Sequence, residues 1–172
     1  IVSSNKKILY HASQSMPHTT SGYAIRTHGL IGAIQNHGYS IEAMLRYGYP
    51  LDRSDFKGVN VHEVETIENV DYNFLSHSNN SQNLINYQEV YNFNKLDVYI
   101  DQAIDAIVKH SIETKPSVLH SASNFVVGLA GIRAAKLLSI PSIYEIRGFW
   151  HLTQSTKRDG YEHSEHYGLT ER

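Results

Sequence analysis

Short apolar stretches alternate with amphipathic helical stretches along most of this chain, and this alternation constrains the fold more than any other feature. The stretches short enough to be buried strands are Lys7–His11, Ile41–Leu45, Val59–Val64, Ser117–His120 and Ser142–Ile146. Apolar residues recur at helical spacing from Gly22 onward, over Leu96–Ile112 and over Phe125–Leu138. Strands that alternate with such helices form βαβ units. The sequence therefore predicts an α/β fold, with a Rossmann-like parallel sheet of five or six strands and helices on both faces.

Two stretches depart from this alternation. Residues 69–94 are rich in asparagine and hold few consecutive aliphatic residues, so we expect a loop with one short helix there. Beyond Trp150 the chain becomes polar and loses its periodicity, so we expect residues 151–167 to be mobile or packed only locally.

Length and composition exclude several classes of protein. A chain of 172 residues is predicted to be one domain. It contains no cysteine, which excludes thiol catalysis, disulfides and cysteine zinc sites. A formal net charge of −2 argues against nucleic acid as a partner.

No apolar run approaches the ~20 residues of a membrane span, and the polar start resembles no signal peptide. We expect a cytoplasmic protein, with peripheral membrane association left open. Because the chain starts at Ile1 rather than Met, we expect it to be a segment of a longer protein.

Three polar or aromatic loops follow predicted strands, at residues 12–21, 121–124 and 147–150. In a parallel sheet the carboxyl ends of the strands share one edge, and ligands bind there. We therefore predict a substrate cleft at this edge. Its candidate residues are His120, Ser121, Ser123, Asn124, Glu145, Arg147, Phe149 and Trp150. Phe149 and Trp150 fit a stacking platform for a ring or core residues that fold the loop down. His120 fits a half-buried packing role equally well.

Ser21 and Gly22 lie where a loop becomes a helix. The free N–H groups and dipole of a helix start favour a phosphate or carboxylate, whereas ordinary capping by Thr20 or Ser21 explains the same residues. The chain has neither the Gly-x-Gly-x-x-Gly fingerprint after its first strand nor a Walker-type Gly-Lys-Ser/Thr.

His163-Ser164-Glu165-His166 offers two or three ligands where a metal site needs three or four, so we predict no metal and no cofactor.

Two segments carry a resemblance to a known family. The first runs Gly22-x3-Arg26-x3-Leu30-x3-Ile34-x2-His37-Gly38-x2-Ile41. The second comprises Val118–Ser123, an Ala- and Leu-rich helix, and Ile140–Trp150, which contains Pro-x-x-Tyr-Glu-x-Arg-Gly-x-Trp. Together they resemble the N-terminal domain of family 4 (group 1) retaining glycosyltransferases. That resemblance implies one half of a GT-B fold over residues 1–172, with the donor-binding C-terminal domain absent from this chain.

The resemblance also implies roles for individual residues. Ser21 and Gly22 match the glycine-rich turn that faces the phosphates of the donor. Arg147 stands where many members have a histidine that contacts the transferred sugar, so no catalytic residue is assigned in this half. Arg147 fits an anionic acceptor group or a salt bridge with Glu145. We expect its guanidinium to point into the cleft, so that Arg147→Ala would hardly change the melting temperature while lowering turnover of the full-length enzyme.

The function implied is transfer of a sugar from a nucleotide-diphosphate sugar to a glycan, lipid or other hydroxyl acceptor. The partners are that donor and acceptor, bound together with the second domain. The fragment alone is expected to be inactive. Two alternatives stay open: a non-catalytic Rossmann-like module that binds a carbohydrate or a partner, and a GT-B sugar-nucleotide epimerase.

Overall fold

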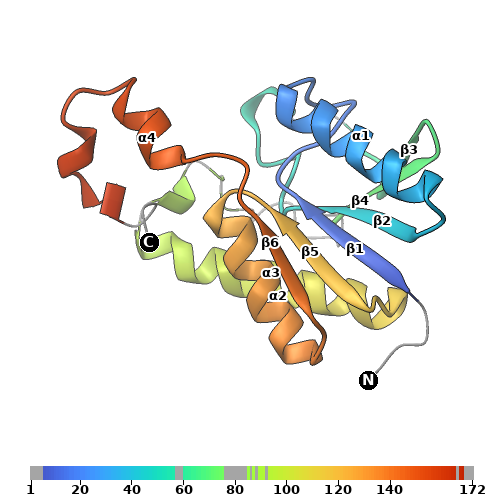
Figure 1. Cartoon of the computed structure of the whole chain (residues 1–172). Helices are drawn as coiled ribbons and strands as arrows, with labels where there is room; N and C mark the ends of the chain where they lie inside the picture. The colour runs from blue at the N-terminus through green and yellow to red at the C-terminus, as the bar shows by residue number, and fades with distance from the viewer. Residues whose placement is uncertain are drawn as a thin grey trace.

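A single twisted sheet forms the centre of the computed structural model (Figure 1), which describes residues 6–56, 60–75, 85, 87, 89–91, 93–165 and 167–168. Six strands of the described residues follow the order β3-β4-β2-β1-β5-β6. They are β1 (Lys7–Ala12), β2 (Ser40–Leu45), β3 (Val64–Ile67), β4 (Val70–Phe74), β5 (Val118–Ala122) and β6 (Ser142–Glu145). Every pairing is parallel except that of β3 with β4.

Helices cover both faces of the sheet. They are α1 (Gly22–Asn36), α2 (Phe93–Thr114) and α3 (Phe125–Leu138), whereas the short α4 (Trp150–Ser155) lies to one side of the sheet. Single 3-10 turns lie at η1 (Ser54–Phe56), η3 (Glu89–Tyr91) and η4 (Tyr161–His163). Helix α1 lies on one face, whereas α2 and α3 pack together on the other (Figure 1). The predicted α/β fold, a mainly parallel sheet with helices on both faces, is confirmed.

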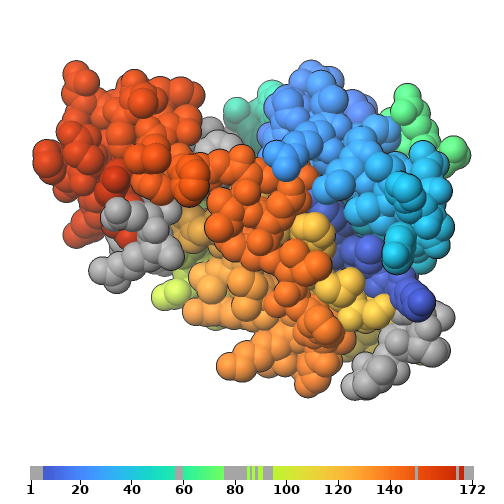
Figure 2. Space-filling model, viewed as in Figure 1, coloured from blue at the N-terminus to red at the C-terminus, as the bar shows by residue number. Residues whose placement is uncertain are grey.

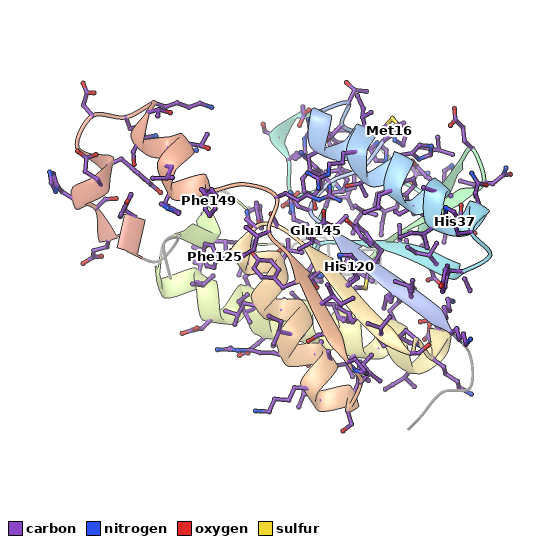
Figure 3. All side chains as sticks on the ribbon, viewed as in Figure 1. Met16, His37, His120, Phe125, Glu145 and Phe149 are labelled. Atoms are coloured by element: carbon purple, nitrogen blue, oxygen red, sulfur yellow. The ribbon has the colours of Figure 1, made fainter. Side chains whose placement is uncertain are left out.

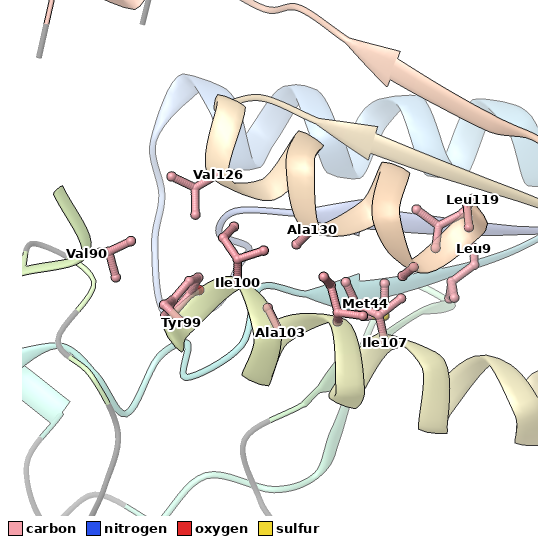
Figure 4. Packing of buried hydrophobic residues seen from close by; sticks show 13 residues of the cluster. Leu9, Met44, Val90, Tyr99, Ile100, Ala103, Ile107, Leu119, Val126 and Ala130 are labelled. Carbon is pink, nitrogen blue, oxygen red and sulfur yellow. The ribbon is translucent and has the colours of Figure 1, made fainter. Parts of the chain in front are cut away.

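Two hydrophobic clusters hold the layers together, one on each face. Leu9, Met44 and Leu119 point from β1, β2 and β5 toward α2 and α3, where they meet Ile100 and Ile107 (Figure 4). Burying each such side chain stabilises the fold by ~1.5–3 kcal/mol. Alternate residues of β1 and β2, together with residues of β4, point toward α1 and form a second cluster. Its members include Tyr10, Leu45, Tyr72 and Phe74.

The third predicted strand is wrong in its position. Residues 60–63 are not in a strand, and Val59 lies outside the described residues. Val61 is nevertheless buried, so the alternation that suggested a strand reflects one core contact in a loop. The strand instead begins at Val64 and turns back through Glu68 and Asn69, which both have positive φ, into β4.

The expectation of a loop from residue 69 onward is therefore wrong over β4. Asn69 belongs to a tight hairpin turn, where asparagine is favoured because it tolerates positive φ. Residues 76–84 and several beyond them lie outside the described residues.

Residues 151–165 and 167 pack mainly on one another, which agrees with the expectation of local packing. Helix α4 contacts η4, and Tyr167 lies edge-on to both His151 and Tyr161. Figure 2 shows these residues as a lobe at one side of the sheet.

Candidate functional site

The three loops predicted to form a cleft do meet at one edge of the sheet. Strands β1, β5 and β6 are neighbours and run parallel, so their carboxyl ends lie together. Ser13 N of the first loop donates to Tyr23 Oη over 3.0 Å, and Tyr23 Oη donates to Ala122 O over 2.9 Å, so Tyr23 of α1 links the first loop to the second. The backbone N of Arg147 donates to Ser123 Oγ over 2.8 Å, which joins the third to the second.

Glu145, the last residue of β6, is the centre of a polar network on the α1 side of the sheet (Figure 3). Tyr10 Oη donates to its Oε2 over 2.7 Å, and Arg147 Nε donates to its Oε1 over 3.0 Å. Burial by itself would raise the pKa of Glu145, but the hydrogen bonds and charge of Arg147, together with the bond from Tyr10, outweigh it and hold the pKa below its usual range. The carboxylate is therefore ionised at neutral pH.

Arg147 is buried, which corrects the expectation of an exposed salt bridge. Its side chain is 3% exposed. Besides Glu145 it donates to Thr27 Oγ1 over 2.7 Å and to Tyr23 O over 3.3 Å, and it also bonds Tyr10 Oη. Thr27 and Tyr23 belong to α1, so the guanidinium ties this helix to β1 and β6. The salt bridge with Glu145, one of the two predicted roles, is present.

His120 faces the same network from β5. Its Nε2 lies 3.3 Å from Glu145 Oε2, within ion-pair range but without the alignment of a hydrogen bond, and its ring leans on Tyr10. Burial lowers the pKa of His120, and this effect exceeds the opposing influence of Glu145. His120 is thus a neutral imidazole at neutral pH, half-buried as one of its two predicted roles requires. Figure 3 shows His120 and Glu145 close together between α1 and β6.

Ser121 and Ser123 do not line a cleft, contrary to the prediction. Ser121 is fully buried and points to α3, where a Cβ on Gly131 would lie 1.9 Å from its Oγ. Strand alternation explains this, because His120 faces α1 and its neighbour must face the opposite side. Ser123 is also buried, and it positions Arg147 through the hydrogen bond to the backbone N.

Asn124 caps α3, since its Oδ1 accepts from Val126 N over 3.2 Å and from Tyr87 Oη over 2.7 Å. Ser21 caps α1 in the same way, accepting from Ala24 N over 3.3 Å. A Cβ added to Gly22 would meet nothing within 4 Å, so the space beside this residue is open. The capping role is established for Ser21, and the contact of Ser21 and Gly22 with donor phosphates stays a prediction.

Phe149 is 66% exposed and touches His151 edge-on. This placement agrees with a surface platform better than with a core role. The side chain of Trp150 lies outside the described residues.

Sequence reasoning missed a second polar group at this edge, the ion pair between Arg46 and Asp52. Arg46 Nη2 donates to Asp52 Oδ1 over 3.2 Å, and its guanidinium lies 3.9 Å from the centre of the Tyr87 ring. Both charged residues are buried. The sequence could have indicated this residue, since Arg46 directly follows the apolar residues of β2 at the same edge as the other loops.

The part of the chain that the structure describes contains neither a metal-ligand cluster nor a membrane-spanning helix. No group of three His, Asp or Glu side chains there lies close enough to hold a metal ion. His163 is exposed, and His166 lies outside the described residues. None of the described helices combines the length and apolar character needed to cross a bilayer.

The sequence matches no protein-family model and no curated protein at a significant level. Solved structures with a similar fold do match. Sucrose-phosphate synthase from Thermosynechococcus elongatus aligns over 97% of this chain and 39% of its own, with a TM-score of 0.67 and 11% identity. MurG from Acinetobacter baumannii aligns over 90% of this chain and 40% of its own, with a TM-score of 0.51 and 16% identity.

A third match is a protein assigned as a UDP-N-acetylglucosamine 2-epimerase from Listeria monocytogenes. It covers 98% of this chain and 38% of its own, with a TM-score of 0.52 and 7% identity. This chain thus spans about two-fifths of each solved structure, and at such identities the likeness concerns the fold. The glycosyltransferases among these structures have the GT-B architecture. The chain accordingly has the fold of one GT-B domain.

Proposed function

We propose that this chain is the N-terminal, acceptor-side domain of a retaining glycosyltransferase of family 4 (group 1). The complete enzyme moves a hexose from a nucleotide-diphosphate sugar to a glycan, lipid or other hydroxyl acceptor. The donor-binding domain follows in the complete polypeptide, and neither a cofactor nor a nucleic acid takes part.

One observation carries this proposal. In a GT-B domain fold, β6 delivers Glu145 and Arg147 to the same edge of the sheet at which α1 begins with Ser21 and Gly22. The open helix start can stabilise negative charge on a leaving diphosphate, and the fixed network beside it can position an acceptor hydroxyl. Exposed Phe149, just beyond, offers a ring for a sugar to stack on.

Each partner of this network has a defined task. Arg147 and Glu145 fix α1 against β6, so that the helix start and the loop at 147–150 keep a constant separation. Neutral His120, whose Nε2 lies 3.3 Å from Glu145 Oε2, holds the inner side of this carboxylate in place.

The test uses the full-length protein. It is incubated with uridine, guanosine and adenosine diphosphate sugars and a panel of glycan and lipid acceptors, and the released nucleoside diphosphate is measured. Transfer to an acceptor supports the proposal, and the anomeric configuration of the product, read by NMR, tests the retaining stereochemistry. A reading frame that stops directly after Arg172 contradicts the proposal.

An epimerase is the second candidate, because the Listeria protein has a similar fold. It predicts conversion of one nucleotide sugar into its epimer without any acceptor. A non-catalytic carbohydrate-binding module predicts binding with no turnover by the full-length protein. The 172-residue chain alone should show no transfer and only weak binding of nucleotide sugars by calorimetry, since one wall of a cleft cannot supply the roughly −8 kcal/mol of micromolar affinity.

A further inference from the structure

Arg26 is a cation beside the Glu145 network that sequence reasoning did not place among the candidate site residues. It lies one turn into α1, and its side chain is 61% exposed. Nη2 donates to Glu145 Oε1 over 3.2 Å, the same oxygen that accepts from Arg147 Nε. Figure 2 shows the atoms of α1 against those of the segment that contains β6.

The network around Glu145 contains one more positive charge than negative charge. Two guanidinium groups share one carboxylate, because Arg147 and Arg26 both pair with Glu145. His120 is neutral at neutral pH, and burial raises the pKa of Tyr10, which therefore keeps its proton. The five groups together carry a formal charge of about +1 at neutral pH.

The two arginines differ in what they can offer a ligand. Arg147 is enclosed and spends its donors on Glu145, Thr27, Tyr23 and Tyr10. Arg26 spends one of its five N–H donors on Glu145 and bonds no other group of the described residues, and its side chain is largely exposed. Glu145 holds the guanidinium in place, so Arg26 loses less conformational entropy on binding than a free surface arginine would.

The position of Arg26 on the helix directs it toward the start of α1. Side chains in a helix lean toward its N-terminus, and Arg26 bonds Glu145 at the edge of the sheet where α1 begins. The earliest hydrogen-bonded N–H groups of that turn are at Ala24 and Ile25, which are bonded to Ser21. The N–H groups before them, at Gly22 and Tyr23, precede the bonded ladder as in any helix start.

We propose that Arg26 binds an anionic group, a phosphate or carboxylate, of the substrate that binds at this edge of the sheet. The anion lies against the outer side of the Arg26 guanidinium, and Glu145 acts as the positioning residue that orients it. This inference deepens the proposed function, on which it rests for the identity of the substrate, by transferring the anion-binding role expected for Arg147 to Arg26.

The first experiment measures binding rather than turnover. The 172-residue chain is titrated with inorganic phosphate and with pyrophosphate, and amide shifts are followed by NMR. Arg26→Gln should weaken binding at least about tenfold, because a hydrogen bond to a charged group is lost. Arg26→Lys should retain part of the affinity. Arg133→Gln, on the exposed side of α3, is the matched control and should change nothing. Thermal melts establish that each variant is folded.

Equal affinity of Arg26→Gln and the unaltered chain overturns the inference. So does an equal loss in Arg26→Gln and Arg133→Gln, which would indicate general charge attraction. If binding falls as expected but the full-length protein transfers no sugar to any acceptor, the anion site stands and the proposed function fails.

The second experiment separates the two sources of the anion in the full-length protein. A nucleoside diphosphate and a short-chain prenyl phosphate are titrated separately into the unaltered protein and into Arg26→Gln. A loss confined to the nucleoside diphosphate assigns the anion to the donor, and one confined to the prenyl phosphate assigns it to an acceptor. Either result supports the inference. Unchanged affinity for both ligands overturns it.

Discussion

Replacing Arg147 by alanine is expected to destabilise the domain strongly. The substitution removes a buried guanidinium that pairs with Glu145 and bonds Thr27, Tyr23 and Tyr10. Breaking a buried ion pair costs ~3–5 kcal/mol, because one charge is left without its partner. In this variant Glu145 still pairs with Arg26, and its side chain is 18% exposed, so we expect a cost near the lower end of that range. For a chain of this length ~3 kcal/mol corresponds to a fall in melting temperature of about 6–12 °C.

The assay is thermal unfolding followed by circular dichroism, supported by urea denaturation at one temperature. Arg133→Ala, an exposed arginine on α3, is the control and should shift the melting temperature by less than about 2 °C. Arg147→Lys should be intermediate, since an ammonium group cannot reach all the acceptors that a planar guanidinium serves. If Arg147→Ala melts like the control, the guanidinium is not held as described and the burial reasoning is refuted. The expected effect of Arg147 on turnover stays a prediction.

Two further predictions concern packing and pH. Burial lowers the pKa of His11 to about 3, so protonation favours the unfolded chain, and the contribution of neutral His11 is complete above about pH 6.5 and lost as the pH falls toward 3. Below pH 6.5 the free energy of unfolding should therefore fall by up to ~1.4 kcal/mol per pH unit more than in His11→Leu. The control is His163→Leu, at a side chain that is 84% exposed, and its free energy of unfolding should depend on pH as that of the unaltered chain does. The same pH dependence in all three proteins would contradict the reasoning. Gly131→Ala should cost ~1–3 kcal/mol in urea denaturation, because the new Cβ would overlap Ser121 Oγ. Gly29→Ala, in open space on α1, should instead stabilise by ~0.5–1 kcal/mol, and a shift of the same sign in both variants would show that the close contact is absent.

The fold class was predictable because it depends on periodicity, which is local. Helix α3 was predicted with its observed bounds, and β1, β2, β5 and β6 were placed within one or two residues. The β3–β4 hairpin was not, because its turn depends on Glu68 and Asn69 at positive φ inside an asparagine-rich stretch that reads as a loop. Val61 suggested a strand where there is none, because a loop residue can be buried by tertiary contacts alone.

The candidate site shows the same division more sharply. The spacing of Glu145 and Arg147, two residues apart at the end of a strand, allows both to reach the same side of the sheet, so their pairing could be anticipated. Their other partners, Tyr10, Thr27 and Arg26, lie more than 110 residues away in sequence, and no local pattern connects them. Ser121 was misplaced although strand alternation alone assigns it to the face opposite His120.

The sequence by itself determined the helices, the strands other than those of the β3–β4 hairpin, the mainly parallel sheet, and the polar loops at its carboxyl edge, because hydrophobic period and chain connectivity suffice for these. Only the tertiary structure decided which of two neighbouring arginines is enclosed and which faces solvent. That outcome depends on how closely α1 packs against β1 and β6: Arg147 fills the space beneath the helix, where Thr27 and Tyr10 satisfy its donors, and Arg26 is left on the outer surface with most of its donors free.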